Sequence, residues 1–196
     1  MTNSFVHLHA HTEYSMLDGA AKIKDYLTKV KELNQPAAAI TDHGNLYGAL
    51  EFVKVAEEIG VKPIIGYEAY ITPGSRFDRP DRQNNKRYHL TLLAENNVGY
   101  QNLVELVSKA FIEGYYYKPR IDYELLKQHS EGIIALSGCL GGEIAQSLAP
   151  DLTTEEGNSG NEKSYSRALE LAKNYQNIFG KDNFFIELHN HGIPEQ

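Results

Sequence analysis

The sequence of 196 residues has a single cysteine, no tryptophan and no long apolar run. One cysteine cannot form an internal disulfide, which favours a reducing, cytoplasmic setting. No stretch approaches the ~20 apolar residues that span a bilayer, and the N-terminus lacks the basic and then apolar pattern of a signal peptide. These absences argue against membrane proteins and against secreted proteins stabilised by disulfides.

Positive charge is also scarce, because 19 Lys and Arg residues are outnumbered by 26 Asp and Glu residues, for a net charge of −7. This balance argues against a protein that holds nucleic acid through its overall field alone, although it leaves room for a local basic patch or bound cations. With 41% hydrophobic and 23% charged residues, the composition is typical of a folded protein, and the length suits one domain.

Three common catalytic motifs are missing. There is no Gly-Lys-Ser/Thr after a glycine loop, no Gly-x-Ser-x-Gly elbow and no Gly-x-Gly-x-x-Gly fingerprint. A P-loop nucleotide site, a serine hydrolase and a dinucleotide-binding fold are therefore not indicated. What the acidic sequence does have is eight histidines beside its one cysteine.

Strand-like and helix-like segments alternate along the chain. Strands are expected at residues 5–11, 37–41, 63–71, 88–94, 132–136 and 184–189. Helical spacing of apolar residues occurs at 20–33, 46–59, 103–111 and 165–179, with Gly60 and Gly180 at two of the ends. This order predicts an α/β fold with a mostly parallel sheet and helices outside it, either open or closed into a barrel.

Two polar segments interrupt this alternation. Residues 72–87 hold five basic and two acidic residues (+3), and residues 151–161 are rich in Thr, Glu, Gly, Asn and Ser. Both are expected to be surface loops, since strand and helix patterns resume after each of them.

Residues that commonly bind metals stand at or near almost every expected strand end. In parallel α/β folds, active sites gather at the carboxyl ends of the strands. The residues in question are His9, His11, Asp42, His43, Glu68, His89, Cys139, Glu187, His189 and His191. Neutral imidazoles suit zinc, manganese and iron, carboxylates can bridge two cations, and a thiolate favours zinc. Two or three such ions can clamp a phosphate and lower the pKa of a bridging water.

Several motifs, in order, resemble the PHP (polymerase and histidinol phosphatase) family. They are His9-Ala10-His11-Thr12, Thr41-Asp42-His43-Gly44, Gly66-Tyr67-Glu68 and Ser137-Gly138-Cys139. Further segments are similar to the PHP domains at the N-terminus of bacterial replicative DNA polymerases, namely 14–19, 43–48, 89–94, 99–103 and 118–120. The resemblance extends from Phe5 to Gln196.

The resemblance implies a distorted (β/α)7 barrel, similar to a TIM barrel, with a metal cluster at the carboxyl ends of its strands. In that family nine side chains hold up to three divalent ions, of which zinc is expected here and manganese, iron or magnesium are alternatives. The positions that match seven of these ligands are His9, His11, Asp18, His43, Glu68, His89 and Cys139. Glu68 would be the bridging carboxylate.

The family's last two ligands, an Asp-x-His pair, have no match in this sequence. The resemblance therefore implies one PHP domain, residues 1–196, that is incomplete and ends before its last strand. Asp18 and Cys139 stand where free-standing phosphatases of the family usually have histidines, a difference typical of its polymerase branch.

Some of these residues have a second interpretation. Asp18 also suits the N-cap of the helix that follows it, and Cys139 could be a small buried hydrophobic residue. Candidates for supporting the ligands or contacting substrate are Asp42, His189 and His191. Candidates for phosphate contacts, with a solvated loop as the alternative, are Arg76, Arg79, Lys86 and Arg87.

The activity that the resemblance implies is metal-dependent phosphodiester hydrolysis with 3′→5′ removal of nucleotides. The nucleophile would be a metal-bound hydroxide and not a side chain. The parent protein would be a DNA-directed DNA polymerase of DNA replication, whose synthetic centre lies beyond residue 196. The expected partners are single-stranded DNA or a primer 3′ end, the rest of the polymerase subunit and a proofreading exonuclease subunit.

Two alternatives stay open at this point. The domain could have a structural metal site and serve to stabilise the polymerase or dock the proofreading subunit. It could also be a free-standing phosphatase for a small phosphomonoester.

Overall fold

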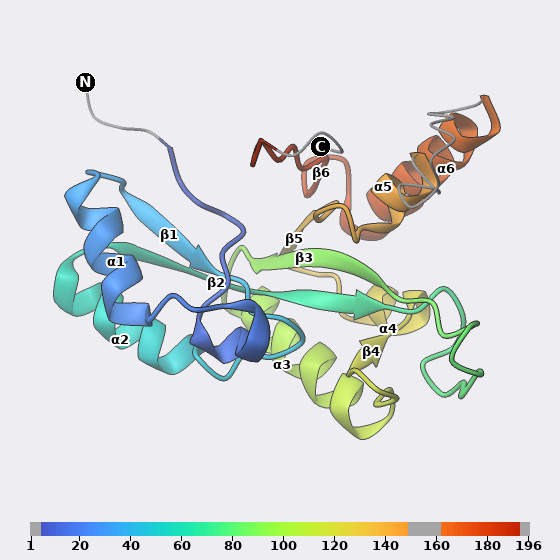
Figure 1. The fold of residues 1–196 in the computed structure, drawn as a ribbon, viewed down its shortest axis with the longest axis horizontal. Coiled ribbons are helices and arrows are strands. Elements are labelled where there is room, and N and C mark those ends of the chain that lie inside the picture. The colour runs from blue at the N-terminus through green and yellow to red at the C-terminus, as the bar shows by residue number, and fades with distance from the viewer. Residues whose placement is uncertain (1–4, 149–161, 193–196) are drawn as a thin grey trace.

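A six-stranded mixed sheet organises the computed structural model, which describes residues 5–148 and 162–192 (Figure 1). The strands are β1 (Ala37–Ile40), β2 (Lys62–Ile71), β3 (Tyr88–Ala94), β4 (Arg120–Ile121), β5 (Ile133–Leu136) and β6 (Phe184–Phe185). Their order is β1-β2-β3-β5-β6, and β4 pairs with β2 beside this path. Within the described ranges the sheet is not closed into a barrel.

Strand β3 runs against its neighbours, so the prediction of a mostly parallel sheet is wrong for this strand. The pairs β1–β2, β2–β4 and β5–β6 are parallel, whereas β2–β3 and β3–β5 are antiparallel. The connection differs in kind: residues 72–87 join β2 to β3 as a loop without a helix, whereas the parallel pair β1–β2 is connected through α2, as is usual for parallel crossovers. The reversal has a useful consequence, since the start of β3 lies at the same edge as the carboxyl ends of the other strands.

The helices agree with the apolar spacing of the sequence. They are η1 (Glu13–Asp18, a 3-10 helix), α1 (Ile23–Glu32), α2 (Ala49–Ile59), α3 (Asn97–Ile112), α4 (Tyr123–Gln128), α5 (Glu143–Leu148) and α6 (Glu162–Phe179). Helix α2 ends at Gly60 in the left-handed conformation (φ 75°), as expected for a C-cap glycine. In Figure 1, α1 and α2 lie beside β1, α3 lies along β2 and β3, and α5 and α6 lie at the far end beyond β5.

Two main clusters of buried apolar side chains hold these layers together. The smaller one joins α1 and α2 to β1 through residues such as Leu27, Ile40 and Phe52. The larger one lies between the sheet and α3, α4 and α6, with Leu106 and Tyr175 among its fully buried members. Burial of this kind is the main force that fixes the strand ends relative to one another.

Several boundary predictions need correction. Residues 5–11 form no strand, although the carbonyls of His7 and Ala10 accept hydrogen bonds from the Ala39 and Thr41 amides. Of the strand expected at 184–189, only β6 is a regular strand. The Ser137 amide donates to the Phe185 carbonyl, and beyond this bond the described part of the chain is not paired as a strand. Strand β4 and helices α4 and α5 were not predicted, because each has at most six residues. The expected loop at 151–161 lies outside the described residues.

Candidate metal centre

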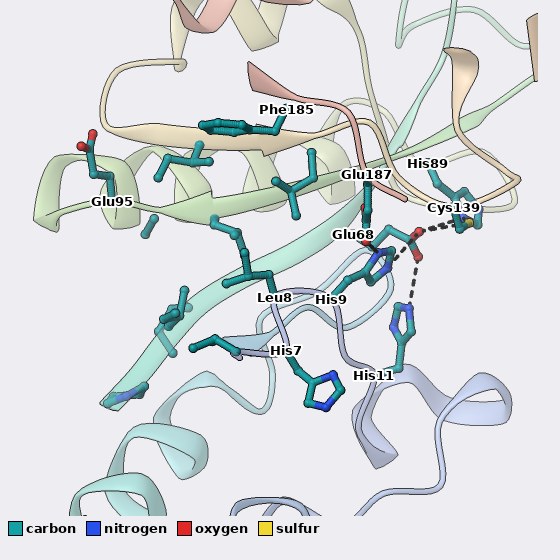
Figure 2. A pocket seen from close by; sticks show the side chains of 18 of the residues that line it. His7, Leu8, His9, His11, Glu68, His89, Glu95, Cys139, Phe185 and Glu187 are labelled. Atoms are coloured by element: carbon teal, nitrogen blue, oxygen red, sulfur yellow. Dashed lines mark hydrogen bonds and ion pairs between the residues drawn. The ribbon is translucent and has the colours of Figure 1, made fainter. Parts of the chain in front are cut away.

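The carboxylate of Glu68 lies at the centre of the predicted ligand set. It belongs to β2, is 1% exposed, and every other predicted ligand except Asp18 has a side-chain atom within 4 Å of it. The distances to Glu68 oxygens are 3.4 Å from His9 Nε2, 3.5 Å from His11 Nε2, 2.5 Å from His43 Nδ1, 3.1 Å from His89 Nδ1 and 3.7 Å from Cys139 Sγ. Figure 2 shows Glu68 among His9, His11, His89 and Cys139, with His7 turned away.

Backbone pairing places His43 beside Glu68. After β1 the chain stays parallel to β2, so that the Glu68 amide donates to the Asp42 carbonyl and the Gly44 amide donates to the Glu68 carbonyl. His43 and Glu68 therefore form an isolated bridge. Two residues on adjacent parallel strands with such pairing point their side chains to the same face.

The register of the antiparallel pair places His89 on that face as well. Glu68 pairs with Thr91 and Tyr70 pairs with His89, so these four side chains lie on one side of the sheet. Gly138, at φ 81°, then turns the chain after β5 so that Cys139 Sγ lies 3.6 Å from His89 Nδ1. An L side chain at position 138 would be strained in this conformation, and its Cβ would meet the His89 carbonyl oxygen at 2.9 Å.

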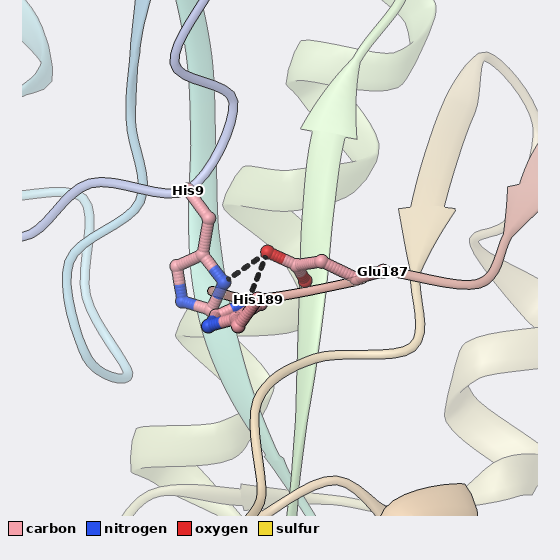
Figure 3. Close-up of side chains that lie close together, drawn as sticks. All are labelled: His9, Glu187 and His189. Carbon is pink, nitrogen blue, oxygen red and sulfur yellow. Dashed lines mark hydrogen bonds and ion pairs between the residues drawn. The ribbon is translucent and has the colours of Figure 1, made fainter. Parts of the chain in front are cut away.

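A second carboxylate, Glu187, binds His9 from the opposite side. Its Oε1 lies 2.7 Å from His9 Nδ1 and 2.7 Å from His189 Nε2, as Figure 3 shows. Because a carboxylate accepts hydrogen bonds, His9 Nδ1 donates to Glu187. The other ring nitrogen, Nε2, faces Glu68 and is the one available to a metal. Thr91 Oγ1 lies 3.2 Å from the same Nδ1.

Asp42 supports the ligands through a buried hydrogen-bond chain. Its carboxylate accepts bonds from the Thr12 amide and hydroxyl and from the Ser15 hydroxyl. The Ser15 oxygen lies 3.1 Å from His11 Nδ1 and accepts a bond from the His43 amide. Asp42 thus holds η1 and the ends of two ligand segments in one arrangement.

Asp18 and His191 complete the placement of the predicted residues. The Asp18 carboxylate contacts His43 Nε2 although 71% of its side chain is exposed. It ends η1 and does not cap α1, whose N-cap is Lys22, so the N-cap interpretation is wrong. The His191 ring lies 5.1 Å from that of His189 at the rim of the same cavity.

Burial and the carboxylates of Glu68 and Glu187 shift the pKa values of the side chains in the site. Burial lowers the pKa of His9, but hydrogen bonds to Glu187 and Glu68 outweigh it and raise that pKa to about 10. Burial and the neighbouring His43 lower the pKa of His11 to about 4. Burial also lowers the pKa of His89, but Cys139 and Glu68 raise it to about 9. Burial raises the pKa of Glu68, yet bonds to His43, His89 and His9 leave it below its usual range.

The unpaired atoms of the site fit a bound cation. Among the described residues, His43 Nδ1, Glu68 Oε2 and Glu187 Oε2 are buried without a hydrogen-bond partner. The first two face each other at 2.5 Å as an ion pair without hydrogen-bond geometry, and buried polar atoms that lack hydrogen bonds are costly. Imidazole nitrogen, carboxylate oxygen and thiol sulfur are together the ligands of zinc and similar divalent metals. His43, Glu68 and His89 form one group with metal-ligand spacing, and His9, His11 and Glu68 form another.

A cavity of about 1610 Å³ opens from the metal centre along the inner face of the sheet. The ligands lie at one end, and Glu95 lies at the other (Figure 2). Between them the lining is mostly apolar and includes Leu93, Ile134 and Phe185.

The four basic residues predicted to contact phosphate divide into two pairs. The Arg76 guanidinium is buried and bonded to Glu113 and Asp122, and Arg79 donates to the backbone carbonyls of residues 76, 78 and 113. The Arg76 donors are thus engaged inside the protein, and those of the exposed Arg79 are engaged by backbone carbonyls, so neither arginine is positioned as a free phosphate contact. Lys86 and Arg87 have no ion pair with any residue in the described ranges and lie in a groove beside His89.

Two supporting residues were not predicted from the sequence. The sequence places Glu187 near a strand end without assigning it a role, and Ser15 lies inside the 14–19 segment that carries the family resemblance. The signal for Glu187 was present, since Glu187 and His189 are two residues apart after a strand. No pattern marks a serine hydroxyl as a bridge between an aspartate and a histidine.

Known proteins were compared with this chain. The PHP domain family model matches residues 7–191. DNA polymerase III subunit alpha of Thermus aquaticus is 53% identical and that of Treponema pallidum is 49% identical, each over 98% of this chain. The chain spans only 15% and 16% of the length of these two relatives. A solved structure described as a candidate metal-dependent phosphoesterase, from Bifidobacterium adolescentis, matches 99% of this chain and 80% of its own with a TM-score of 0.53 and 14% identity.

Proposed function

This chain belongs to the PHP domain family, and from that premise we propose that it is a metal-dependent phosphodiesterase domain of a DNA polymerase III alpha subunit. The identity of about half to such subunits over 98% of the chain supports the choice of parent protein. The fold likeness to a candidate phosphoesterase agrees with the α/β architecture expected of this family.

One observation carries the proposal. Side chains from five separate parts of the chain, the 9–18 segment, the end of β1, β2, β3 and the loop after β5, meet around the buried Glu68 carboxylate. Burying so many polar and ionisable side chains together is costly unless a ligand such as a cation satisfies them. Convergence of this kind is characteristic of a multi-metal centre.

The residues that would hold the ions are His9, His11, Asp18, His43, Glu68, His89 and Cys139. Divalent cations bound there, zinc in our proposal, would supply Lewis-acid activation of the phosphodiester and an acidified water. Oε1 of Glu68 faces His9 and His89, and Oε2 faces His11 and His43. Glu187 and Asp42 orient His9 and His11, and no serine or lysine in the described site is placed as a nucleophile.

The role that we propose for the whole protein is taken from its relatives, the DNA polymerase III alpha subunits. We propose that the parent is a cytoplasmic DNA-directed DNA polymerase of DNA replication and that this domain acts on single-stranded DNA or a primer 3′ end. The rest of the polymerase subunit and a proofreading exonuclease subunit are its proposed protein partners. Among the described residues no helix is long and apolar enough to cross a membrane.

The test combines metal analysis with hydrolysis of two substrates. Protein loaded with zinc or manganese is expected to bind metal and to shorten a single-stranded oligonucleotide from its 3′ end. Glu68→Gln is expected to lose the metal and the activity by at least 100-fold, since it removes the shared charge. Glu95→Gln, in the same cavity but away from the ligands, serves as the matched control and should retain both.

Other results would contradict the proposal. Metal bound without hydrolysis of the oligonucleotide or of p-nitrophenyl phosphate would refute catalysis and leave a structural or docking role. Hydrolysis of p-nitrophenyl phosphate alone would favour a phosphomonoesterase.

A further inference from the structure

A second hollow adjoins the metal centre on the far side of His89. It has a volume of about 720 Å³, within the range of ligand-binding pockets. One wall is the end of the 72–87 loop with the start of β3, and the other is formed by α5 and the first turns of α6. The residues that define this groove are Asn85, Lys86, Arg87, Tyr88, His89, Gly141, Glu143, Gln146, Ser147, Lys163, Ser164 and Arg167.

The groove concentrates positive charge in an otherwise acidic protein. Lys86 and Arg87 come from the loop wall, and Lys163 and Arg167 come from successive turns of α6. None of the four forms an ion pair with a described residue. The net charge of the chain is −7, so a groove with four cations that make no ion pair among the described residues differs from the rest of the molecule.

The one carboxylate in the groove does not neutralise these cations directly. Glu143 is 5% exposed, and its Oε2 accepts hydrogen bonds from the hydroxyls of Tyr123 and Tyr175. The Glu143 carboxylate therefore faces the buried tyrosine hydroxyls and not the cations of the groove.

The other arginines of this region have structural roles. Arg120 is fully buried and donates to the carbonyls of Gly114, Arg76 and Asp78. It also donates to the Asn85 side chain, which lines the groove. This contact connects the loop that carries Lys86 and Arg87 to a buried arginine. The loop wall of the groove is therefore held in place by the protein interior and is not only a solvated loop.

The groove leads directly to the metal centre. His89 lines both hollows, with its ring near Glu68 and Cys139 and its amide donating to the Gly141 carbonyl. A chain of phosphates in the groove would therefore reach the metal ligands at His89.

We propose that this groove binds the phosphate backbone of single-stranded DNA next to the metal centre, with Lys163 and Arg167 of α6 as contacts opposite Lys86 and Arg87. The claim that a bound strand is then hydrolysed rests on the proposed function, whereas the binding itself does not. Mononucleotides have the same anionic group and are distinguished in the test. Flexible cations that line a groove are typical of sequence-independent binding of single strands.

The test measures binding of a dye-labelled twelve-residue oligothymidylate by fluorescence anisotropy, using the metal-free chain so that the strand stays intact. The double variant Lys163→Ala and Arg167→Ala is expected to bind at least 10-fold more weakly than wild type at 50 mM salt. The slope of log K against log salt should fall by about 1.4, because each lost phosphate contact on a single strand changes it by about 0.7. Hydrolysis of bis(p-nitrophenyl) phosphate by the zinc-loaded chain, which needs only the metal centre, should be unchanged.

A matched control separates the groove from general charge loss. Lys173→Ala with Lys181→Ala also removes two cations, one from α6 and one just after it, but neither residue lines the groove. Equal weakening by both double variants would overturn the proposal. Lys86→Ala, on the opposite wall, is expected to weaken binding several-fold. Because this residue is not in α6, such weakening cannot come from a folding defect of that helix.

The remaining outcomes are also decisive. No binding of the oligonucleotide by wild type, or its displacement by an equal phosphate concentration of thymidine monophosphate, would overturn a DNA groove. If wild type hydrolyses neither substrate but the groove variants bind DNA more weakly than their control, the groove stands and the proposed function fails.

Discussion

The bond between Glu187 and His9 illustrates how single side chains tune this site. A carboxylate on the outer nitrogen of a metal-binding histidine fixes its orientation and makes it a better ligand. The two residues are 178 positions apart in the sequence and 2.7 Å apart in the structure. Burial raises the pKa of Glu187, but its bonds to His9 and His189 outweigh this and hold the pKa below its usual range.

Replacing Glu187 by Gln should weaken metal binding without unfolding the protein. The amide has nearly the same shape, so it can still accept a bond from His9 but lacks the charge. We expect about a 10- to 100-fold loss of zinc affinity, measured by competition with a chromophoric chelator. Glu170→Gln, on the exposed face of α6, is the control. Equal zinc affinity for Glu187→Gln and wild type would show that the carboxylate does not position His9.

The seven proposed ligands could be predicted because each lies in a short motif that is visible in the sequence. The supporting contacts could not. Whether Arg76 meets a phosphate or Glu113 depends on which carboxylate lies closer in the folded chain, and this competition leaves no local pattern. The same holds for Ser15, whose role depends on Asp42 and His11 meeting on either side of it.

Among the elements, three helices meet at one buried hydrogen-bond cluster. Glu143 begins α5, Tyr123 begins α4 and Tyr175 lies in α6, and their side chains bond to one another. This cluster fixes α6, and with it Lys163 and Arg167, relative to the loop wall of the groove.

Removal of one hydroxyl from the cluster should therefore destabilise the fold. Tyr175→Phe leaves the buried Glu143 with one donor fewer, and we expect a loss of about 1–3 kcal/mol in the free energy of unfolding. Urea denaturation measures this loss, and Tyr165→Phe on the exposed face of the same helix should change it by less than about 0.5 kcal/mol. Equal stabilities for the two variants would contradict the assigned role of the cluster.

Element types followed from periodicity, but strand direction did not. The limits of β3 agree with the sequence pattern, since alternation and apolar content are local properties. Its antiparallel direction depends on whether the preceding loop crosses the sheet, which composition alone does not reveal. The short elements β4, α4 and α5 depend on tertiary contacts more than on their own propensities.

For the molecule as a whole, the candidate metal centre joins segments that the apolar clusters hold separately. Its ligands come from the 9–18 segment and β1, packed with one cluster, and from β2, β3 and the loop after β5, packed with the other. A cation bound among them would connect both halves of the described structure, and ligands that bind only the native state stabilise it.

Removal of the metal should consequently lower the melting temperature. If zinc is present at 1,000 times its dissociation constant, binding contributes about 4 kcal/mol, which corresponds to roughly 10 °C for a chain of this size. Differential scanning calorimetry of zinc-loaded and chelator-treated protein measures the difference. Glu68→Gln should show no gain with zinc, and a wild-type melting temperature that is insensitive to chelation would argue against a bound metal.

The sequence by itself determined the family, the order of most strands and helices, and the residues that carry metal-binding chemistry. All of these follow from local motifs and from the spacing of apolar residues along the chain. Only the tertiary structure decided that Glu187 supports His9 and which basic residues line the groove beside His89. The physical reason is that these roles depend on strand register and on competition between partners distant in the sequence, and the distances that settle them exist only once the chain has folded.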